Sequence, residues 1–141
     1  MTDKPSTPRV LIADDHAGIV NQVAALLRPE FEVVATARDG MSALDCVRRL
    51  DPDIALLDLY MPGMNGLDVV RTLKTSGVRT VAVIMTGYND SELAKAALSA
   101  GALAFIAKSR LTHDLLPAVR GALQGCVFVS KFTAMKSTQV D

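Results

Sequence analysis

The sequence predicts an α/β protein with an open parallel sheet, and three observations support this fold class. Five short apolar runs alternate with stretches of helical periodicity. Most of the runs are apolar at consecutive positions, as in central parallel strands that are covered on both faces. Turn-forming residues separate the two kinds of segment. Because right-handed crossovers join such units, five βα units in series give a five-stranded parallel sheet with helices on both faces.

The expected strands are the apolar runs at residues 10–13, 33–35, 54–57, 81–85 and 103–107. Between the first two runs, apolar residues recur at i, i+1, i+4, i+7 and i+8 from Ile19, which predicts an amphipathic helix. Similar apolar stripes begin at Ala43, Val69, Leu93 and Leu111.

Helix and strand boundaries have their own signals. Pro29, Gly77 and Gly101 follow expected helices, where they end the helical pattern. Asn65 stands just before an expected helix and Ser91 at the start of another, and both residue types favour the helix N-terminus.

The composition indicates one globular domain. Half of the 141 residues are hydrophobic, which argues against a disordered chain. Fifteen basic and fifteen acidic residues cancel, so net charge gives no reason to expect binding to nucleic acid or to an anionic membrane. No apolar run approaches the roughly 20 residues of a membrane span, and Cys46 and Cys126 have no metal-like or redox-like spacing. We therefore expect a cytoplasmic protein with reduced thiols.

Polar side chains follow four of the expected strands. Asp14 and Asp15 follow the first strand, Asp58 the third, Thr86 the fourth and Lys108 the fifth. Ligands of open α/β sheets bind beyond the carboxyl ends of the strands, where these side chains meet. A single Asp in such a place is usually a helix cap or a turn former. A cap at Asp15 would not explain why the other carboxylates and the lysine share one edge.

The residue types at this edge predict phosphoryl chemistry. Three neighbouring carboxylates repel one another unless a cation joins them. Mg²⁺ is suited to such a site, because it prefers oxygen ligands and keeps waters that substrate oxygens can replace. Lys108 supplies a second positive charge and Thr86 a hydroxyl donor. We therefore expect Asp58 to accept a phosphoryl group, with Mg²⁺ and Lys108 neutralising charge and Thr86 fixing an oxygen.

These residues resemble the receiver domain of two-component response regulators. The matching features are Asp14-Asp15, Asp58 with the following Met61-Pro62-Gly63-Met64-Asn65-Gly66, Thr86-Gly87, and Gly101-Ala102 leading through Phe105 to Lys108. The resemblance implies a flavodoxin-like (βα)5 fold with strand order 2-1-3-4-5. It divides the chain into a disordered segment at 1–8, a receiver domain at 9–125 and a tail or linker start at 126–141.

The resemblance also implies a role for each site residue. Asp58 takes phosphate from a sensor histidine kinase or a phosphotransfer protein. Asp15 and Asp58 bind Mg²⁺ directly, Asp14 binds it through water, and the Tyr60 carbonyl completes the metal site.

Two residues are expected to act as switches after phosphorylation. Thr86 moves toward the phosphate and Phe105 turns inward. This alters the surface of the fourth helix, fifth strand and fifth helix, where receivers dimerise or meet partners.

Three features of the site differ from the common pattern or add to it. Phe105 stands where tyrosine is common, so burial must bias the switch without a hydroxyl. Ser109 stands where proline is frequent, and without proline a cis bond after Lys108 costs about 3 kcal/mol. Tyr60 and Tyr88 are expected to flank the phosphate and to shield it from water.

The start Asp14-Asp15-His16 and the closing Ala118-Val119-Arg120, Gly125 and Val129-Ser130 most resemble receivers of LuxR-type helix-turn-helix regulators. A transcriptional regulator is therefore expected, of which this chain is the receiver part. The chain shows no recognition-helix pattern or basic patch, so we expect no nucleic-acid binding by this part.

Other functions stay open at this point. The alternatives are a stand-alone receiver and a Mg²⁺-dependent phosphohydrolase that uses an aspartyl phosphate. Such hydrolases generally carry an acid two residues after the nucleophile, where this chain has Tyr60. A flavodoxin-like cofactor binder would need a glycine-rich phosphate loop in place of Asp14-Asp15.

Overall fold

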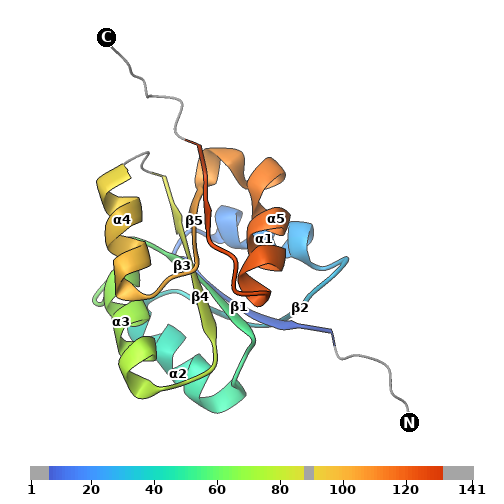
Figure 1. Ribbon diagram of the computed structural model, residues 1–141. Helices are drawn as coiled ribbons and strands as arrows, with labels where there is room; N and C mark the ends of the chain where they lie inside the picture. The colour runs from blue at the N-terminus through green and yellow to red at the C-terminus, as the bar shows by residue number, and fades with distance from the viewer. Residues whose placement is uncertain (1–6, 88–90, 132–141) are drawn as a thin grey trace.

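The computed structural model describes residues 7–87 and 91–131, which form a single parallel sheet between two layers of helices (Figure 1). The sheet has six strands in the order β2-β1-β3-β4-β5-β6, and all neighbouring strands are parallel. The strands are β1 (Arg9–Ala13), β2 (Glu32–Ala37), β3 (Ile54–Asp58), β4 (Val81–Thr86), β5 (Ala104–Ala107) and β6 (Phe128–Val129). The α/β class and the order of the first five strands are confirmed.

The expected number of strands was wrong, because β6 adds a sixth at the edge beside β5. This strand has two residues, and Phe128 N–H donates to the Leu103 carbonyl at 3.0 Å. A run this short has no measurable periodicity, and its pairing depends on a neighbour far away in the sequence. The sequence pattern alone therefore assigned these residues to a tail.

Five helices and one short 3-10 helix connect the strands. They are α1 (Ala17–Leu27), α2 (Gly40–Leu50), α3 (Gly66–Ser76), α4 (Ser91–Ala100), η1 (Lys108–Arg110) and α5 (Leu111–Leu123). Helices α1 and α5 cover one face of the sheet, and α2, α3 and α4 cover the other (Figure 1). This two-sided cover explains why the strands are apolar at consecutive positions.

Two hydrophobic cores lie on opposite faces of the sheet. In β3, which is buried at every position, Leu56 packs on the side of α1 and α5, and Leu57 packs on the side of α2, α3 and α4. Asp58 is the last residue of this strand, where the sheet ends. The apolar body of β3 thus holds a carboxylate rigidly at the rim of the sheet.

The expected boundaries of α3 are confirmed. The Asn65 side chain accepts a hydrogen bond from Asp68 N–H at 2.9 Å, and Gly77 ends the helix with φ of 72°. The start of α1 differs, because His16 occupies the N-cap position and makes no side-chain capping hydrogen bond. Asp15 therefore does not cap this helix, and a capping role does not explain it.

Three smaller expectations concern the chain chemistry. Cys46 and Cys126 are both free thiols. The Lys108–Ser109 peptide bond is trans, so the cis geometry is not adopted. Within residues 7–87 and 91–131, no helix is long and apolar enough to cross a membrane.

Candidate functional site

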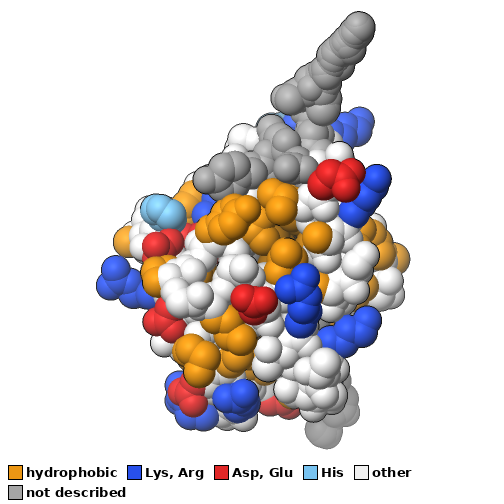
Figure 2. Space-filling model, turned by 90° about the vertical axis from the view of Figure 1, so that its left-hand side faces the viewer, with side chains coloured by type: hydrophobic (Ala, Val, Ile, Leu, Met, Phe, Trp, Pro, Cys, Tyr) orange, Lys and Arg blue, Asp and Glu red, His pale blue; other side chains and the backbone are white. Residues whose placement is uncertain are grey.

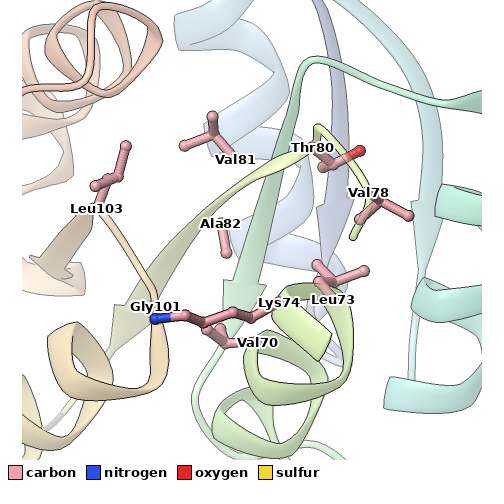
Figure 3. A pocket seen from close by; sticks show the side chains of 9 residues that line it. All are labelled: Val70, Leu73, Lys74, Val78, Thr80, Val81, Ala82, Gly101 and Leu103. Atoms are coloured by element: carbon pink, nitrogen blue, oxygen red, sulfur yellow. The ribbon is translucent and has the colours of Figure 1, made fainter. Parts of the chain in front are cut away.

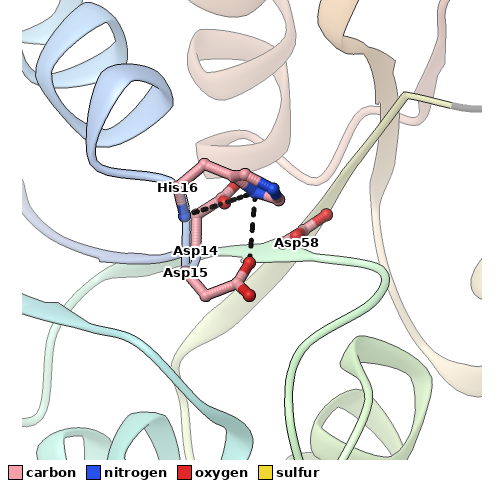
Figure 4. Close-up of side chains that lie close together, drawn as sticks. All are labelled: Asp14, Asp15, His16 and Asp58. Atoms are coloured by element: carbon pink, nitrogen blue, oxygen red, sulfur yellow. Dashed lines mark hydrogen bonds and ion pairs between the residues drawn. The ribbon is translucent and has the colours of Figure 1, made fainter.

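The carboxyl edge of the sheet brings the expected site residues together. Asp14 directly follows β1, Asp58 ends β3, Thr86 ends β4 and Lys108 directly follows β5. Because parallel strands end at the same edge, residues distant in the sequence become neighbours there. Figure 4 shows the acidic part of this group, with His16 beside the aspartates.

Asp14, Asp15, His16 and Asp58 form a compact cluster. Each offers one ligand atom, and these atoms all lie within 4.8 Å of one another. Asp14 and Asp58 are almost completely buried, with 1% and 4% of their surface exposed. Buried carboxylates this close are unfavourable unless cations compensate their charge.

Lys108 supplies one such cation. Its Nζ lies 2.6 Å from Asp14 Oδ2 and 3.1 Å from Asp58 Oδ1. The lysine side chain is itself largely buried, at 14% exposure, so solvent screens these contacts only weakly. The structure thus places Lys108 against two of the aspartates that precede it in the sequence.

The pKa of Asp58 is raised above the usual value of an aspartate. Burial is the main cause, and the neighbouring Asp14 charge adds to it. The Lys108 charge and a hydrogen bond from the Tyr60 backbone N–H oppose the increase without cancelling it. A divalent cation bound beside Asp58 would favour its ionised form and so oppose this increase.

His16 is a member of the cluster that sequence reasoning noted only as part of a motif. Its backbone N–H donates to Asp14 Oδ1 at 2.9 Å. Its Nδ1 lies 3.0 Å from Asp14 Oδ1 and 3.1 Å from Asp15 Oδ1. The signal in the sequence was a histidine immediately after two acids, but spacing alone does not tell whether the ring turns back toward them.

The oxygens of the cluster suit a hard metal ion. Asp14 Oδ2 and Asp15 Oδ1 are buried oxygens. Asp14 Oδ2 lies 2.6 Å from Lys108 Nζ, and Asp15 Oδ1 lies 3.1 Å from the His16 ring nitrogen Nδ1. Carboxylate oxygens are the ligand type that Mg²⁺ and Ca²⁺ prefer.

An open cleft of about 530 Å³ gives access to the cluster. Its lining is His16, Ile19, Asp58, Tyr60, Gly87 and Lys108. The Tyr60 side chain is 51% exposed, so it stands at the rim of this cleft. Tyr88, the other aromatic expected here, lies outside the described residues.

Thr86 and Phe105, the expected switch residues, lie on neighbouring strands. Thr86 is buried and pairs with Ala107, the residue just before Lys108. Phe105 pairs with Ile84, is fully buried, and packs in the core that includes Ala94 and Ala97 of α4. The aromatic ring is therefore inside the protein in this structure, and its switching role stays a prediction.

A second cavity, of about 310 Å³, lies at the opposite edge of the sheet (Figure 3). It opens between the ends of α3 and α4 and the start of β4, and aliphatic side chains such as Leu73, Val78 and Leu103 line it. Its lining contains no carboxylate and a single charged group, on Lys74. This cavity offers none of the chemistry of the acidic cluster.

Comparison with known proteins agrees with this geometry. Residues 10–120 match the family model for the response regulator receiver domain. The nitrate/nitrite response regulator protein NarP of Escherichia coli (strain K12) is 42% identical over 123 residues, which are 85% of this chain and 57% of NarP. A protein-glutamate methylesterase/protein-glutamine glutaminase of Myxococcus xanthus (strain DK1622) is 44% identical over 104 residues, 71% of this chain and 30% of that protein.

A solved structure shares the fold as well. The two-component response regulator of the LuxR family from Aurantimonas sp. SI85-9A1 superposes with a TM-score of 0.85 at 31% identity, covering 93% of this chain and 95% of that chain. Measured against NarP, this chain spans little more than half of the relative's length. The family match, the sheet order and the acidic edge agree with one another, and the chain belongs to the response regulator receiver domains and is similar to those of LuxR-type regulators.

Proposed function

We propose that this receiver works as a phosphoacceptor switch in which Asp58 is the nucleophile. The observation that carries the proposal is the position of Lys108, which contacts both Asp14 and Asp58 inside a buried acidic cluster. An ion pair of this kind costs desolvation energy and is seldom kept for stability alone. At the end of an open cleft, it fits a site that binds a highly charged group.

The donor is a phosphohistidine on a sensor histidine kinase or a phosphotransfer protein. An oxygen of Asp58 attacks phosphorus, the phosphorus–nitrogen bond breaks, and its electron pair returns to the donor imidazole. Asp58 thereby becomes a mixed anhydride that carries the phosphoryl group. Lys108 neutralises the charge on the phosphoryl oxygens, and the Thr86 hydroxyl donates to one of them.

Asp15, Asp58 and the Tyr60 carbonyl would hold Mg²⁺, with Asp14 acting through a water. The ion supplies charge stabilisation to the phosphoryl oxygens and orients them. The proposal is supported by the buried carboxylate oxygens of Asp14 and Asp15, which lie in one compact cluster with Asp58. The raised pKa of Asp58, caused first by burial, agrees with a carboxylate that functions beside a cation.

The output passes through α4, β5 and α5. Phosphate on Asp58 draws Thr86 toward it, and Phe105 transmits the change to the surface of these elements. Helix α4 keeps Leu93, Ala96 and Leu98 half-buried. Figure 2 shows the α4 side, where a hydrophobic patch lies among charged side chains. A homodimer or another partner would cover this surface.

The larger protein to which this receiver belongs is a cytoplasmic transcriptional regulator. The relation to NarP and to a LuxR-family regulator supports this output. The receiver itself catalyses only its own phosphorylation and dephosphorylation, and it does not bind nucleic acid.

Incubation with acetyl phosphate and Mg²⁺, followed by measurement of the intact mass, tests the proposal. The wild-type protein should gain one phosphoryl group, which is stable to acid and is removed by base or hydroxylamine. Asp58→Asn should gain none, whereas Asp45→Asn, which changes an exposed aspartate on α2, should behave as the wild type. Equal incorporation in Asp58→Asn would overturn the proposed function.

A further inference from the structure

Ser130, just after β6, makes three hydrogen bonds, two with β5 and one with α5. Its backbone N–H donates to the Phe105 carbonyl at 2.9 Å. Its hydroxyl accepts from Ala107 N–H at 3.0 Å and donates to Asp114 Oδ2 at 2.7 Å. Only 2% of Ser130 is exposed. A buried hydroxyl with both its donor and its acceptor used holds one orientation.

Asp114 of α5 fixes the orientation of the Ser130 hydroxyl, which accepts from Ala107 N–H. This carboxylate is buried and also pairs with Arg110, whose Nε lies 2.9 Å from Asp114 Oδ2. Burial alone would favour its neutral form, but the hydrogen bond from Ser130 and the contact with Arg110 outweigh burial, so the pKa of Asp114 is lowered. Because the carboxylate stays ionised, it accepts the hydroxyl proton, and the hydroxyl oxygen is directed at Ala107 N–H.

The Ala107 N–H donates to the Ser130 side chain beyond the end of β6, which ends at Val129. The Ser130 hydroxyl takes the place that another strand residue would fill. Lys108 comes directly after Ala107, and Thr86 is the partner of Ala107 on β4. The hydroxyl therefore fixes the backbone at the point from which Lys108 extends to Asp14 and Asp58.

Phe128 supplies the apolar packing of this segment, because it is half-buried against the core on the side of α1 and α5. Val127 is 60% exposed and Val129 is 38% exposed, so they add little to it. Docking of the segment therefore also depends on its backbone bonds to β5 and on Ser130. Loss of one buried hydrogen bond should weaken the docking of β6 and should leave the backbone at the end of β5 less firmly fixed.

We propose that Ser130 is a positioning residue for Lys108, through which docking of the β6 segment is coupled to occupation of the phosphoryl site. The proposal rests on the proposed function of Asp58 and extends it to a residue outside the acidic cluster. By linkage, a segment that orients Lys108 is itself held more firmly when the site is filled.

Binding of Mg²⁺ alone and of beryllofluoride with Mg²⁺, a phosphoryl mimic, tests this coupling in the whole chain. Lys108 contacts the phosphoryl group and not the metal, so the two affinities should separate. Ser130→Ala should bind Mg²⁺ within about twofold of the wild type but beryllofluoride about fivefold more weakly, the effect of one ordinary buried hydrogen bond. Ser130→Thr, which keeps a hydroxyl, should restore the affinity, and Lys131→Ala, an exposed neighbour, should change neither.

The results distinguish this proposal from the proposed function. A wild-type protein that binds no beryllofluoride and takes no phosphoryl group overturns the phosphoacceptor function itself, and the coupling with it. If the wild type binds beryllofluoride and Ser130→Ala binds it equally well, only the role of Ser130 is overturned. An equal loss of Mg²⁺ and beryllofluoride affinity shows general destabilisation, which also contradicts a positioning role.

Discussion

At the scale of single residues, the site depends on how buried charges are balanced. Lys108 lies between Asp14 and Asp58, and His16 lies between Asp14 and Asp15. Each buried carboxylate thus has a nitrogen beside it. Removal of one cation should change the affinity of the remaining oxygens for any other cation.

Lys108→Met should separate metal binding from phosphoryl transfer. The substitution keeps most of the side-chain volume and removes the charge, so the carboxylates should bind Mg²⁺ more tightly, by about three- to tenfold. The same variant should take up phosphate from acetyl phosphate much more slowly, because no charge faces the phosphoryl oxygens. Calorimetry measures the first effect and intact mass against time the second.

Lys95→Met, which changes an exposed lysine of α4, is the matched control and should leave both quantities unchanged. Mg²⁺ affinity that falls in Lys108→Met would mean that the lysine organises the carboxylates more than it competes with the metal.

At the scale of elements, the site depends on the close contact of α3 with the end of β3. A Cβ atom on Gly66 would lie 2.5 Å from the Asp58 carbonyl oxygen and 3.1 Å from Leu59 Cα. The first atom belongs to Asp58, the last residue of β3, and the second belongs to the backbone of the residue that follows it. Glycine at the first turn of α3 therefore lets the helix begin directly against the site.

Gly66→Ala should lower the free energy of unfolding by about 1–3 kcal/mol, because the backbone must shift to admit the methyl group. Gly18→Ala in α1 is the control, since a Cβ there meets nothing within 4 Å. Alanine at this helical position should stabilise the protein by about 0.5–1 kcal/mol. Urea unfolding measures both, and equal stabilities for the two variants would contradict the close packing of α3 on β3.

The contact of α5 with β6 predicts a dependence of stability on pH. The pKa of Asp114 is lowered in the folded protein, as described above. As the pH falls, Asp114 is therefore protonated in the unfolded chain before it is protonated in the folded protein. The free energy of unfolding decreases as the pH falls from the unfolded pKa of Asp114, about 3.9, through its folded pKa. Above the unfolded pKa this contribution is fully present.

Asp114→Asn should remove that part of the acid-side loss of stability, so its urea midpoint should depend less on pH between about 5 and 3 than that of the wild type. Asp45→Asn, whose carboxylate is exposed and pairs with Arg49, should keep the steeper wild-type dependence. Parallel curves for wild type and Asp114→Asn would contradict an ionised Asp114 in the folded protein.

At the scale of the whole molecule, the sheet is a rigid platform between two cores, and the site is attached to one edge of it. Much of this was predictable. Consecutive apolar residues indicate covered parallel strands, and the carboxyl ends of such strands meet, so the grouping of Asp14, Asp58 and Lys108 follows from strand order alone.

The remainder depends on tertiary contacts that leave no local pattern. β6 is two residues long and pairs only because β5 exposes an edge there. The Ser130–Asp114 hydrogen bond joins residues 16 positions apart. The chain between them runs from α5 through a turn to β6, and the periodicity of apolar residues does not show that the two side chains meet. The orientation of the His16 ring is likewise decided by the two acids around it, and not by its place in the sequence.

The central claim is that Asp58, among three clustered aspartates, is the one that accepts the phosphoryl group. Borohydride reduction of the protein treated with acetyl phosphate and Mg²⁺ converts an aspartyl phosphate to homoserine, and tandem mass spectrometry then locates the changed residue. With Asp58 as the phosphoacceptor, the change should occur at position 58 alone and should require Mg²⁺. Reduction at position 14 or 15, or none anywhere in a protein that has gained phosphate, would contradict it.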